Sequence, residues 1–368
     1  MKTVVILAFN PGNAGMYSVD LAARSMFNGD PNVGFFVAQK GPRGGPRIYG
    51  INLRRLTVDA VRQAERIIYW GDFLNNPLYG RADFSKRDVD LGYSVNASDA
   101  FRRWRALFLL DAPELQSSQA DFLSFGGNFM NFAKALNAEL NEVRYRELLG
   151  RFREIRPRDT RSYAELRSLA PNHVVLAPGM DCAFLLDQPR PRFRRARYFV
   201  HLFRRSEISE SDAIISDVAR ATGLEPIPII HWLRLAAVNL NGFPFVLRSH
   251  LFFRMLEMIG EAAFVLTDVY HLSVNAIRCG TRTICVGRDG DQDTTVSDLK
   301  KRVLLEDLNI LEDYLEVGPE TTASEIAAMV HFRLKEAEYF HDRLPIIDRM
   351  VQSFREEVEA TINPSKML

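Results

Sequence analysis

The stretch from Ala262 to Gly287 constrains the fold of this chain most, because it reads as a strand, a helix and a second strand in close succession. Ala263–Leu266 is a short apolar run of strand type, and Thr281–Val286 is a second run rich in β-branched residues. Between them, the apolar spacing over Val269–Cys279 predicts a buried helix, and Gly280 stands where a left-handed C-cap belongs. Strand, helix and parallel strand form a right-handed crossover unit, and ligands bind at the carboxyl ends of such strands.

The alternation of short strands and helices continues along the chain, which indicates parallel α/β architecture. A chain of 368 residues is too long for one ordinary core and suits two such domains. The segment Gln188–Arg192 is rich in proline and arginine and is typical of a linker. We therefore expect an N-terminal α/β domain at 1–190, a second at 191–320, and a helical region at 321–368 that packs back on the first.

Composition narrows the class of protein. Hydrophobic residues make up 47% and charged residues 25%, as in soluble globular proteins, and a net charge of +1 gives no argument for a nucleic-acid partner. Three cysteines cannot all pair, and their apolar surroundings predict buried free thiols in a reducing compartment. The start of the chain reads as a strand rather than a signal peptide, so we expect a cytoplasmic protein. The acidic run Asp289–Asp293 lacks the spacing of a calcium loop, so no metal is expected.

Polar residues follow several expected strands at the positions where ligands bind. In the first domain these residues are Asn13, Asp72, Asn128, Arg158 and Asp181. In the second domain they are Arg204, Arg205, Asp268, Tyr270 and His271.

The run Thr267-Asp268-Val269-Tyr270-His271 resembles the Thr-Asp-Arg-Leu-His signature of the polysaccharide pyruvyl transferase family. The Thr, Asp and His match, whereas Val269 stands in place of the arginine. Further elements of that family occur in matching order over nearly the whole chain: Asn13 with Gly15, Gly126–Asn128, Arg158-Asp159 with Ser162, Asp181, Arg204 with Arg205, and Lys300 or Lys301.

The resemblance implies two Rossmann-like domains that face one another across a cleft, the GT-B arrangement, with a C-terminal helix crossing back to the first domain. It implies transfer of a pyruvyl group from phosphoenolpyruvate to sugar hydroxyls as a ketal, in cell-surface or exopolysaccharide biosynthesis. Phosphoenolpyruvate is then the donor substrate, and no cofactor is expected. The acceptor would be a saccharide or a lipid-linked saccharide, and the latter would bring the protein to the inner face of the membrane as a peripheral protein.

The resemblance also implies roles for the strand-end residues. His271 would be the catalytic acid or base. Arg204 or Arg205 would hold the donor anion, with strand alternation turning only one of them toward the site, and Tyr270 and Asp268 would complete the donor side. Asn13, Asp72, Asn128, Arg158 and Asp181 would face the acceptor.

The sequence leaves alternatives open. Asp159 is expected to cap a helix, Asp181 could do the same, and Asp72 and Asn128 could serve as turn residues only. The same fold is compatible with a GT-B glycosyltransferase that uses a nucleotide sugar. Val269 in place of the family's arginine is compatible with a non-catalytic relative. The acceptor sugar, the linkage and the oligomeric state are not fixed by the sequence.

Overall fold

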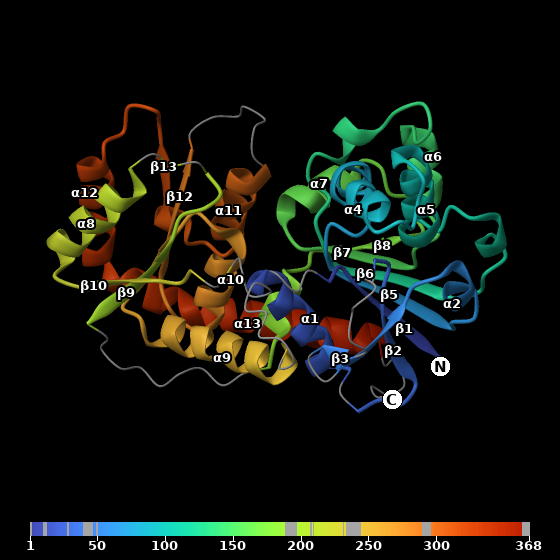
Figure 1. The fold of residues 1–368 in the computed structure, drawn as a ribbon, viewed down its shortest axis with the longest axis horizontal. Helices are drawn as coiled ribbons and strands as arrows, with labels where there is room; N and C mark the ends of the chain where they lie inside the picture. Colours follow the sequence, from blue (N-terminus) through green and yellow to red (C-terminus); the bar gives the residue numbers. More distant parts are fainter. Residues whose placement is uncertain are drawn as a thin grey trace. The chain divides into compact units, whose positions relative to one another are not determined.

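The structure, a computed structural model, describes residues 2–9, 13–27, 29–39, 47–48, 51–187, 197–206, 208, 210–230, 232, 244–288 and 296–362. The chain divides into two compact units (Figure 1). Unit 1 comprises Met1–Asn10, Val19–Leu186 and Val358–Leu368, and unit 2 comprises Pro11–Ser18 and Asp187–Glu357.

These divisions differ from the expected domains in three ways. Unit 2 starts at Asp187 rather than 191, and it also takes Pro11–Ser18 from the start of the chain. Most of the expected region 321–368 belongs to unit 2, because only Val358–Leu368 groups with unit 1. The segment Gln188–Arg192, expected as a linker, and the acidic run Asp289–Asp293 lie outside the described residues.

Unit 1 is built on an eight-stranded sheet in the order β3-β4-β2-β1-β5-β6-β7-β8, in which only the β3–β4 pair is antiparallel. Its strands are β1 (Thr3–Leu7), β2 (Val33–Val37), β3 (Arg47–Ile48), β4 (Ile51–Arg55), β5 (Arg66–Asp72), β6 (Asp121–Gly127), β7 (Glu154–Pro157) and β8 (Val175–Leu176). Its helices are α1 (Ala14–Met26, which begins in unit 2), α2 (Val58–Arg62), α3 (Pro77–Tyr79), α4 (Ser85–Asp90), α5 (Ala97–Phe108), α6 (Glu142–Leu149) and α7 (Thr160–Arg167), with the short turns η1 (Gly80–Phe84), η2 (Pro113–Leu115), η3 (Phe132–Ala135) and η4 (Cys182–Leu185).

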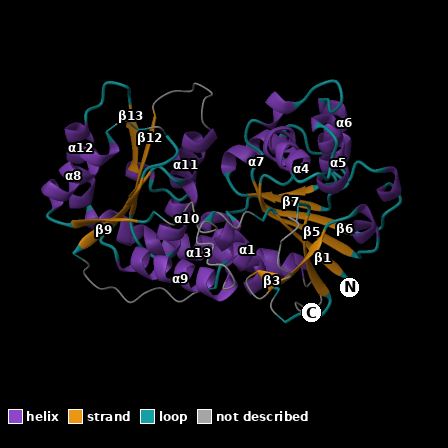
Figure 2. Cartoon of the chain, viewed as in Figure 1, coloured by secondary structure: helices purple, strands orange, loops and turns teal. Residues whose placement is uncertain are grey.

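The central strands of unit 1 carry apolar side chains at successive positions because both faces of the sheet are covered. Ile67, Ile68, Tyr69 and Trp70 of β5 are each 1% exposed or less. Such continuous apolar runs are typical of parallel strands between two layers of helices. Figures 1 and 2 show α4, α5, α6 and α7 on one face of this sheet, and side chains of α5 and α6 pack into the same core cluster as Tyr69.

Unit 2 is built on a five-stranded parallel sheet in the order β10-β9-β11-β12-β13. Its strands are β9 (Tyr198–Leu202), β10 (Glu225–Pro228), β11 (Val265–Thr267), β12 (Thr283–Arg288) and β13 (Tyr314–Val317). Its helices are α8 (Ser211–Thr222), α9 (Pro244–Glu261), α10 (Tyr270–Arg278), α11 (Val296–Asp307), α12 (Ala323–Lys335) and α13 (Ala337–Ile362, whose last turn enters unit 1), with the turn η6 (Leu311–Asp313).

The expected crossover unit is confirmed. β11 pairs with β12 in parallel, and α10 connects them. Gly280 has the left-handed φ of +80° that the C-cap requires. A capping box of Thr322 and Glu325 stands at the start of α12. Two parallel α/β sheets in one chain confirm the predicted fold class, and the last turn of α13 returns to unit 1, where Arg66 donates to the carbonyl of Ile362.

Candidate functional site

Asp268, which follows β11, is held by three successive backbone amides. Its Oδ1 accepts from the N–H of Arg204 at 2.8 Å, and its Oδ2 accepts from those of Arg205 and Ser206 at 2.7 and 2.8 Å. The residue is 1% exposed. These charge-assisted bonds use the carboxylate to fix the loop after β9. Asp268 therefore has a structural role, and the donor contact expected for it stays a prediction.

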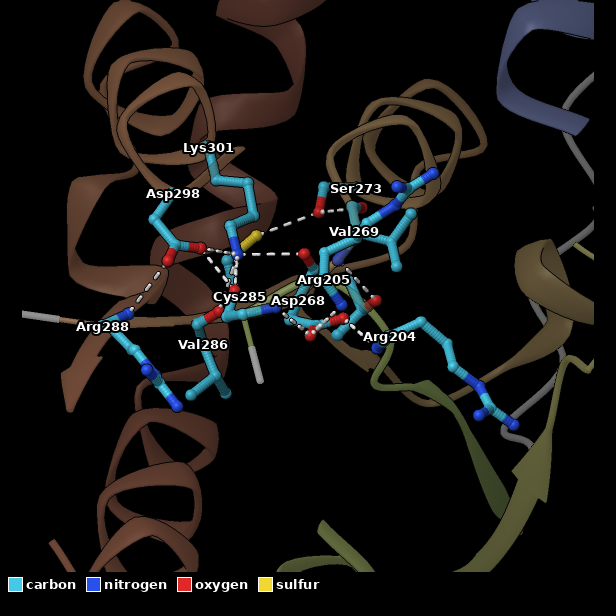
Figure 3. Close-up of polar contacts among 12 residues, drawn as sticks. Arg204, Arg205, Asp268, Val269, Ser273, Cys285, Val286, Arg288, Asp298 and Lys301 are labelled. Atoms are coloured by element: carbon cyan, nitrogen blue, oxygen red, sulfur yellow. Dashed lines mark hydrogen bonds and ion pairs between the residues drawn. The ribbon is translucent and has the colours of Figure 1, made fainter. Parts of the chain in front are cut away.

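Lys301 of α11 joins the same strand ends (Figure 3). Its Nζ lies 2.6 Å from Asp298 Oδ1 and donates to Ser206 Oγ at 2.8 Å. It also donates to the backbone carbonyls of Asp268 and Val286, each at 2.9 Å. The side chain is completely buried and is paired with Asp298, as buried charges usually are. The network therefore ties the ends of β9, β11 and β12 into one rigid edge.

Three exposed arginines lie at this carboxyl edge of unit 2, where its strands end. Arg204 and Arg205 are exposed, and Arg288, the last residue of β12, is exposed as well. Figure 3 shows the Arg204 side chain extending away from the Asp268–Lys301 network. Because β9 already ends at Leu202, both arginines lie in a loop, and the strand alternation expected to separate them does not apply.

His271 and Tyr270 occupy the first turn of α10, at the same edge. Val269 is the N-cap of this helix and contributes no side-chain cap. His271 is 8% exposed and contacts the Tyr270 ring edge-on at 5.0 Å between centroids. Lys300 lies over the Tyr270 ring at 5.5 Å. Val269 therefore puts an apolar side chain, 5% exposed, where the resembling family has its arginine.

Gly15 packs so closely against His271 that no side chain fits at its position. A Cβ built on Gly15 would lie 2.1 Å from the Cβ of His271, which no side chain permits. Gly15 lies in the first turn of α1, and its N–H donates to Asn13 Oδ1 at 2.9 Å. Asn13 thus caps the start of α1, and the acceptor contact expected for it stays a prediction.

The remaining predicted residues lie at the carboxyl edge of the unit 1 sheet. Asp181 Oδ1 caps η4 through the N–H of Ala183 at 2.9 Å. Arg158 is fully buried, 3.3 Å from Asp159 Oδ2 and 3.7 Å from Asp181 Oδ2. Asp159 caps α7, which confirms the expectation. An arginine held between two carboxylates stabilises these strand ends whether or not it also contacts a ligand.

Asp72 and Asn128 lie next to each other in unit 1. The carbonyl oxygen of Asp72 accepts from the N–H of Asn128 at 2.7 Å, and Asp72 has a left-handed φ of +54°. Asn128 is 1% exposed, and its Oδ1 accepts from the N–H of Met130 at 3.0 Å. Its Nδ2 has no hydrogen-bond partner among the described residues.

Asp20 of α1 is a polar residue that no sequence pattern singled out. It is completely buried, and neither carboxylate oxygen has a hydrogen-bond partner in the described part of the chain. Burial raises the pKa of this carboxyl well above its usual range, and the nearby Asp72 raises it further. In the sequence it looks like any aspartate on a helix, and nothing in its neighbours marks it as buried.

The three cysteines are free and buried, as expected. Burial raises the pKa of the Cys285 thiol to about 11, although a hydrogen bond with Ser273 and the charge of Lys301 act in the opposite direction. Burial likewise raises the pKa of Cys182. Thiols with such pKa values stay protonated near neutral pH and are poor nucleophiles.

No group of three or more His, Cys, Asp or Glu side chains is placed to hold a metal ion within the described ranges. Over the same residues, every helix is too short or too polar to cross a bilayer. A pocket of about 380 Å³ in unit 2 is lined by Ala263, Phe264, Thr281 and Arg282, which precede β11 and β12. It therefore lies at the amino edge of the sheet, opposite the residues described above.

No family model and no curated protein matches this sequence. Among solved structures, a putative UDP-N-acetylglucosamine 2-epimerase from Listeria monocytogenes is similar over 93% of this chain and 90% of that chain, with 9% identity and a TM-score of 0.51. The Anabaena protein Alr3699/HepE, in complex with UDP and glucose, covers 99% and 100% with 11% identity and a TM-score of 0.46. The spinosyn rhamnosyltransferase SpnG covers 99% and 100% with 12% identity and a TM-score of 0.47.

At such low identity, the likeness concerns the fold alone. Together with the two parallel sheets, it places the chain in the two-domain, Rossmann-like GT-B fold class.

Proposed function

We propose that this protein is a glycosyltransferase that moves a sugar from a nucleotide-sugar donor to a saccharide hydroxyl, with the donor diphosphate bound at the carboxyl edge of unit 2. The GT-B fold is compatible with this activity but does not specify it. One protein with a similar fold, the putative 2-epimerase from Listeria monocytogenes, is named for a UDP-sugar, which supports a nucleotide sugar as the ligand class.

The observation that carries the proposal is the separation of charges at this edge. The carboxylates of Asp268 and Asp298 are bound internally by backbone amides, Ser206 and Lys301. Among the described residues, three exposed guanidinium groups lie at these strand ends, those of Arg204, Arg205 and Arg288. Guanidinium groups bind phosphate oxygens through paired, charge-assisted hydrogen bonds.

The start of α10 adds to this preference for an anion. The helix runs for nine residues from Tyr270, and its positive dipole end lies at the same strand ends. Helix N-termini bind phosphate groups in many α/β proteins. A diphosphate placed there would be stabilised both while it binds and while it leaves the sugar, as the acceptor oxygen attacks the anomeric carbon.

Pyruvyl transfer from phosphoenolpyruvate is the second candidate. It is favoured by the position of His271, buried at the start of α10 directly after the Thr267-Asp268 strand end. Phosphoenolpyruvate also presents a phosphate and a carboxylate, which the same cations would bind. The two candidates therefore differ in whether the bound anion carries a nucleoside.

A thermal-shift panel of UDP-, GDP- and CMP-sugars and phosphoenolpyruvate tests the proposal. We expect one nucleotide-sugar class to raise the melting temperature, because a ligand of the folded state stabilises it by RT ln(1 + [L]/Kd). The double variant Arg204→Ala/Arg205→Ala should weaken that ligand at least about tenfold, which corresponds to about 1.4 kcal/mol.

Arg220→Ala is the matched control, since Arg220 is an exposed arginine of unit 2 paired with Asp217 on α8. It should leave the affinity unchanged. Stabilisation by phosphoenolpyruvate alone would replace the proposed activity with pyruvyl transfer. Equal losses in the control and in the double variant would remove the donor site from this edge.

A further inference from the structure

We propose that Asp20, with Asp72 and Asn128, forms a subsite in unit 1 that binds a hydroxyl group of the saccharide acceptor. The polar groups present favour a hydroxyl as the ligand, and the identification of that ligand as the saccharide acceptor rests on the proposed function. Asp20 is the new element, because nothing in the sequence separates it from a surface aspartate on a helix.

The first argument is the state of the Asp20 carboxyl. It is 0% exposed, and neither oxygen has a partner among the described residues. Asp88 of α4 provides the contrast within the same unit. It is equally buried, but it accepts from Ser94 Oγ at 2.5 Å and pairs with Arg103. Buried polar side chains nearly always have hydrogen-bond partners, as Asp88 does. A buried carboxyl without a partner, such as that of Asp20, therefore indicates that a ligand group is missing.

The second argument is where Asp20 lies. Its neighbour Val19 accepts a hydrogen bond from Trp70 Nε1 at 2.9 Å through its backbone carbonyl, and a Cβ on Gly71 would meet Val19 Cγ1 at 2.6 Å. This segment of α1 therefore packs against the end of β5. Asp72 follows directly, close enough to raise the pKa of Asp20. Asp20 thus belongs to the carboxyl edge of the sheet, where α/β sheets bind ligands.

The third argument is a second polar group without a hydrogen-bond partner among the described residues, the side-chain amide of Asn128 at the same edge. The N–H of Asn128 donates to the Asp72 carbonyl, while its buried Nδ2 has no partner within the described residues. The edge therefore offers an unused donor and two unused acceptor oxygens. The left-handed φ of Asp72 is a further local strain, of the kind that concentrates at binding sites.

These groups select a ligand class. A hydroxyl both donates and accepts, so it can satisfy a carboxyl and an amide together. A phosphate oxygen that only accepts would leave the acceptor oxygen of the Asp20 carboxyl without a donor. An ammonium group would suit the carboxylates but would leave the amide donor of Asn128 unpaired. A sugar, which presents adjacent hydroxyls, matches the whole set.

The test measures binding of methyl glycosides of glucose, galactose, mannose and N-acetylglucosamine by saturation-transfer NMR, together with melting temperatures. We expect the unaltered protein to bind at least one of them. Asp20→Leu should weaken that glycoside at least about tenfold while its melting temperature stays equal or rises, because an unpaired buried carboxyl destabilises the fold. Asp20→Asn, nearly the same in size, should weaken binding less and guards against misfolding of the leucine variant.

Asp88→Asn is the matched control. It breaks a bonded buried carboxylate, so it should lower the melting temperature and leave glycoside binding intact. If the Asp20 variants instead lose stability and keep their glycoside affinity, Asp20 holds a buried water and the subsite is refuted. Absence of binding by all four glycosides to the unaltered protein refutes it as well.

The two proposals fail separately. Nucleotide-sugar stabilisation should persist in Asp20→Leu, since the donor cations belong to unit 2. A protein that binds glycosides through Asp20 but responds to no nucleotide sugar would retain the subsite and lose the proposed glycosyltransferase activity.

Discussion

At the scale of single residues, several side chains that were expected to contact ligands accept hydrogen bonds from backbone N–H groups. Asn13 and Asp181 each accept an N–H two residues further on, at the start of α1 and of η4. Asp268 accepts three such groups. Short polar side chains at strand ends bond local amides readily, so their residue type alone does not separate a cap from a ligand contact.

Gly15→Ala tests the close approach to His271. The added Cβ would lie 2.1 Å from the Cβ of His271, so α1 or α10 must shift. We expect a destabilisation of about 1–3 kcal/mol, as for overpacked cores, and a fall of a few degrees in the melting temperature. Gly318→Ala is the control, because its nearest atom, Thr321 Oγ1, is 3.8 Å away. An unchanged melting temperature for Gly15→Ala would show that the two residues do not touch.

At the scale of elements, the loop after β9 is positioned by groups far away in the sequence. Ser206 bonds both Asp298 and Lys301 of α11, and Lys301 reaches the carbonyl of Asp268. The loop thus owes its conformation to β11 and α11 rather than to its own sequence. It also carries Arg204 and Arg205, the two arginines proposed to bind the donor.

Asp268→Asn tests this dependence. The amide keeps the size of the carboxylate but loses its charge and turns a donor toward backbone N–H groups. We expect a loss of about 2–3 kcal/mol, since hydrogen bonds to charged groups contribute about 1.5–3 kcal/mol each. Thermal melting and hydrogen exchange at the Arg204, Arg205 and Ser206 amides measure it.

The control for this loop is Asp217→Asn, whose carboxylate pairs with the exposed Arg220 and accepts from Ser324 Oγ, where a change of about 1 kcal/mol or less is expected. Retained protection of the three amides in Asp268→Asn would mean that the loop is ordered without the carboxylate.

At the scale of the whole molecule, the chain passes between the units more than once. Pro11–Ser18 groups with unit 2 although both flanking segments belong to unit 1, and Val358–Leu368 returns to unit 1 from unit 2. Val358 is 0% exposed, and Arg153 donates to the carbonyl of Thr361 at 3.1 Å. The last turn of α13 is therefore part of the unit 1 fold.

Truncation after Glu357 should destabilise unit 1 selectively. It removes the buried Val358 and leaves Arg66 and Arg153 without the carbonyls of Ile362 and Thr361. Hydrogen exchange should show faster exchange in β5, β6 and β7, with the strands of unit 2 nearly unaffected. Truncation after Ile362, which keeps all of these contacts, is the control. Equal exchange in the two truncated proteins would contradict the assignment of this turn to unit 1.

Much of the architecture was readable from local pattern. The strand, helix and strand at β11, α10 and β12 follow from apolar periodicity, and the φ of Gly280 follows from its place after a helix. The caps at Asp159 and Thr322 follow from residue type and spacing. Each of these features depends on residues a few positions apart, which the sequence displays directly.

The burial and the hydrogen-bond partners of the site residues were decided by the tertiary structure. Asp20 reads as an ordinary helical aspartate, and only the packing of α1 against the end of β5 buries it unpaired among the residues described. Gly15 reads as a turn residue until His271, far along the chain, lies against it. Lys301 reads as a surface lysine until three strand ends surround it. Burial and hydrogen bonding between distant segments arise only when the elements pack, and no local sequence period records which of them will meet.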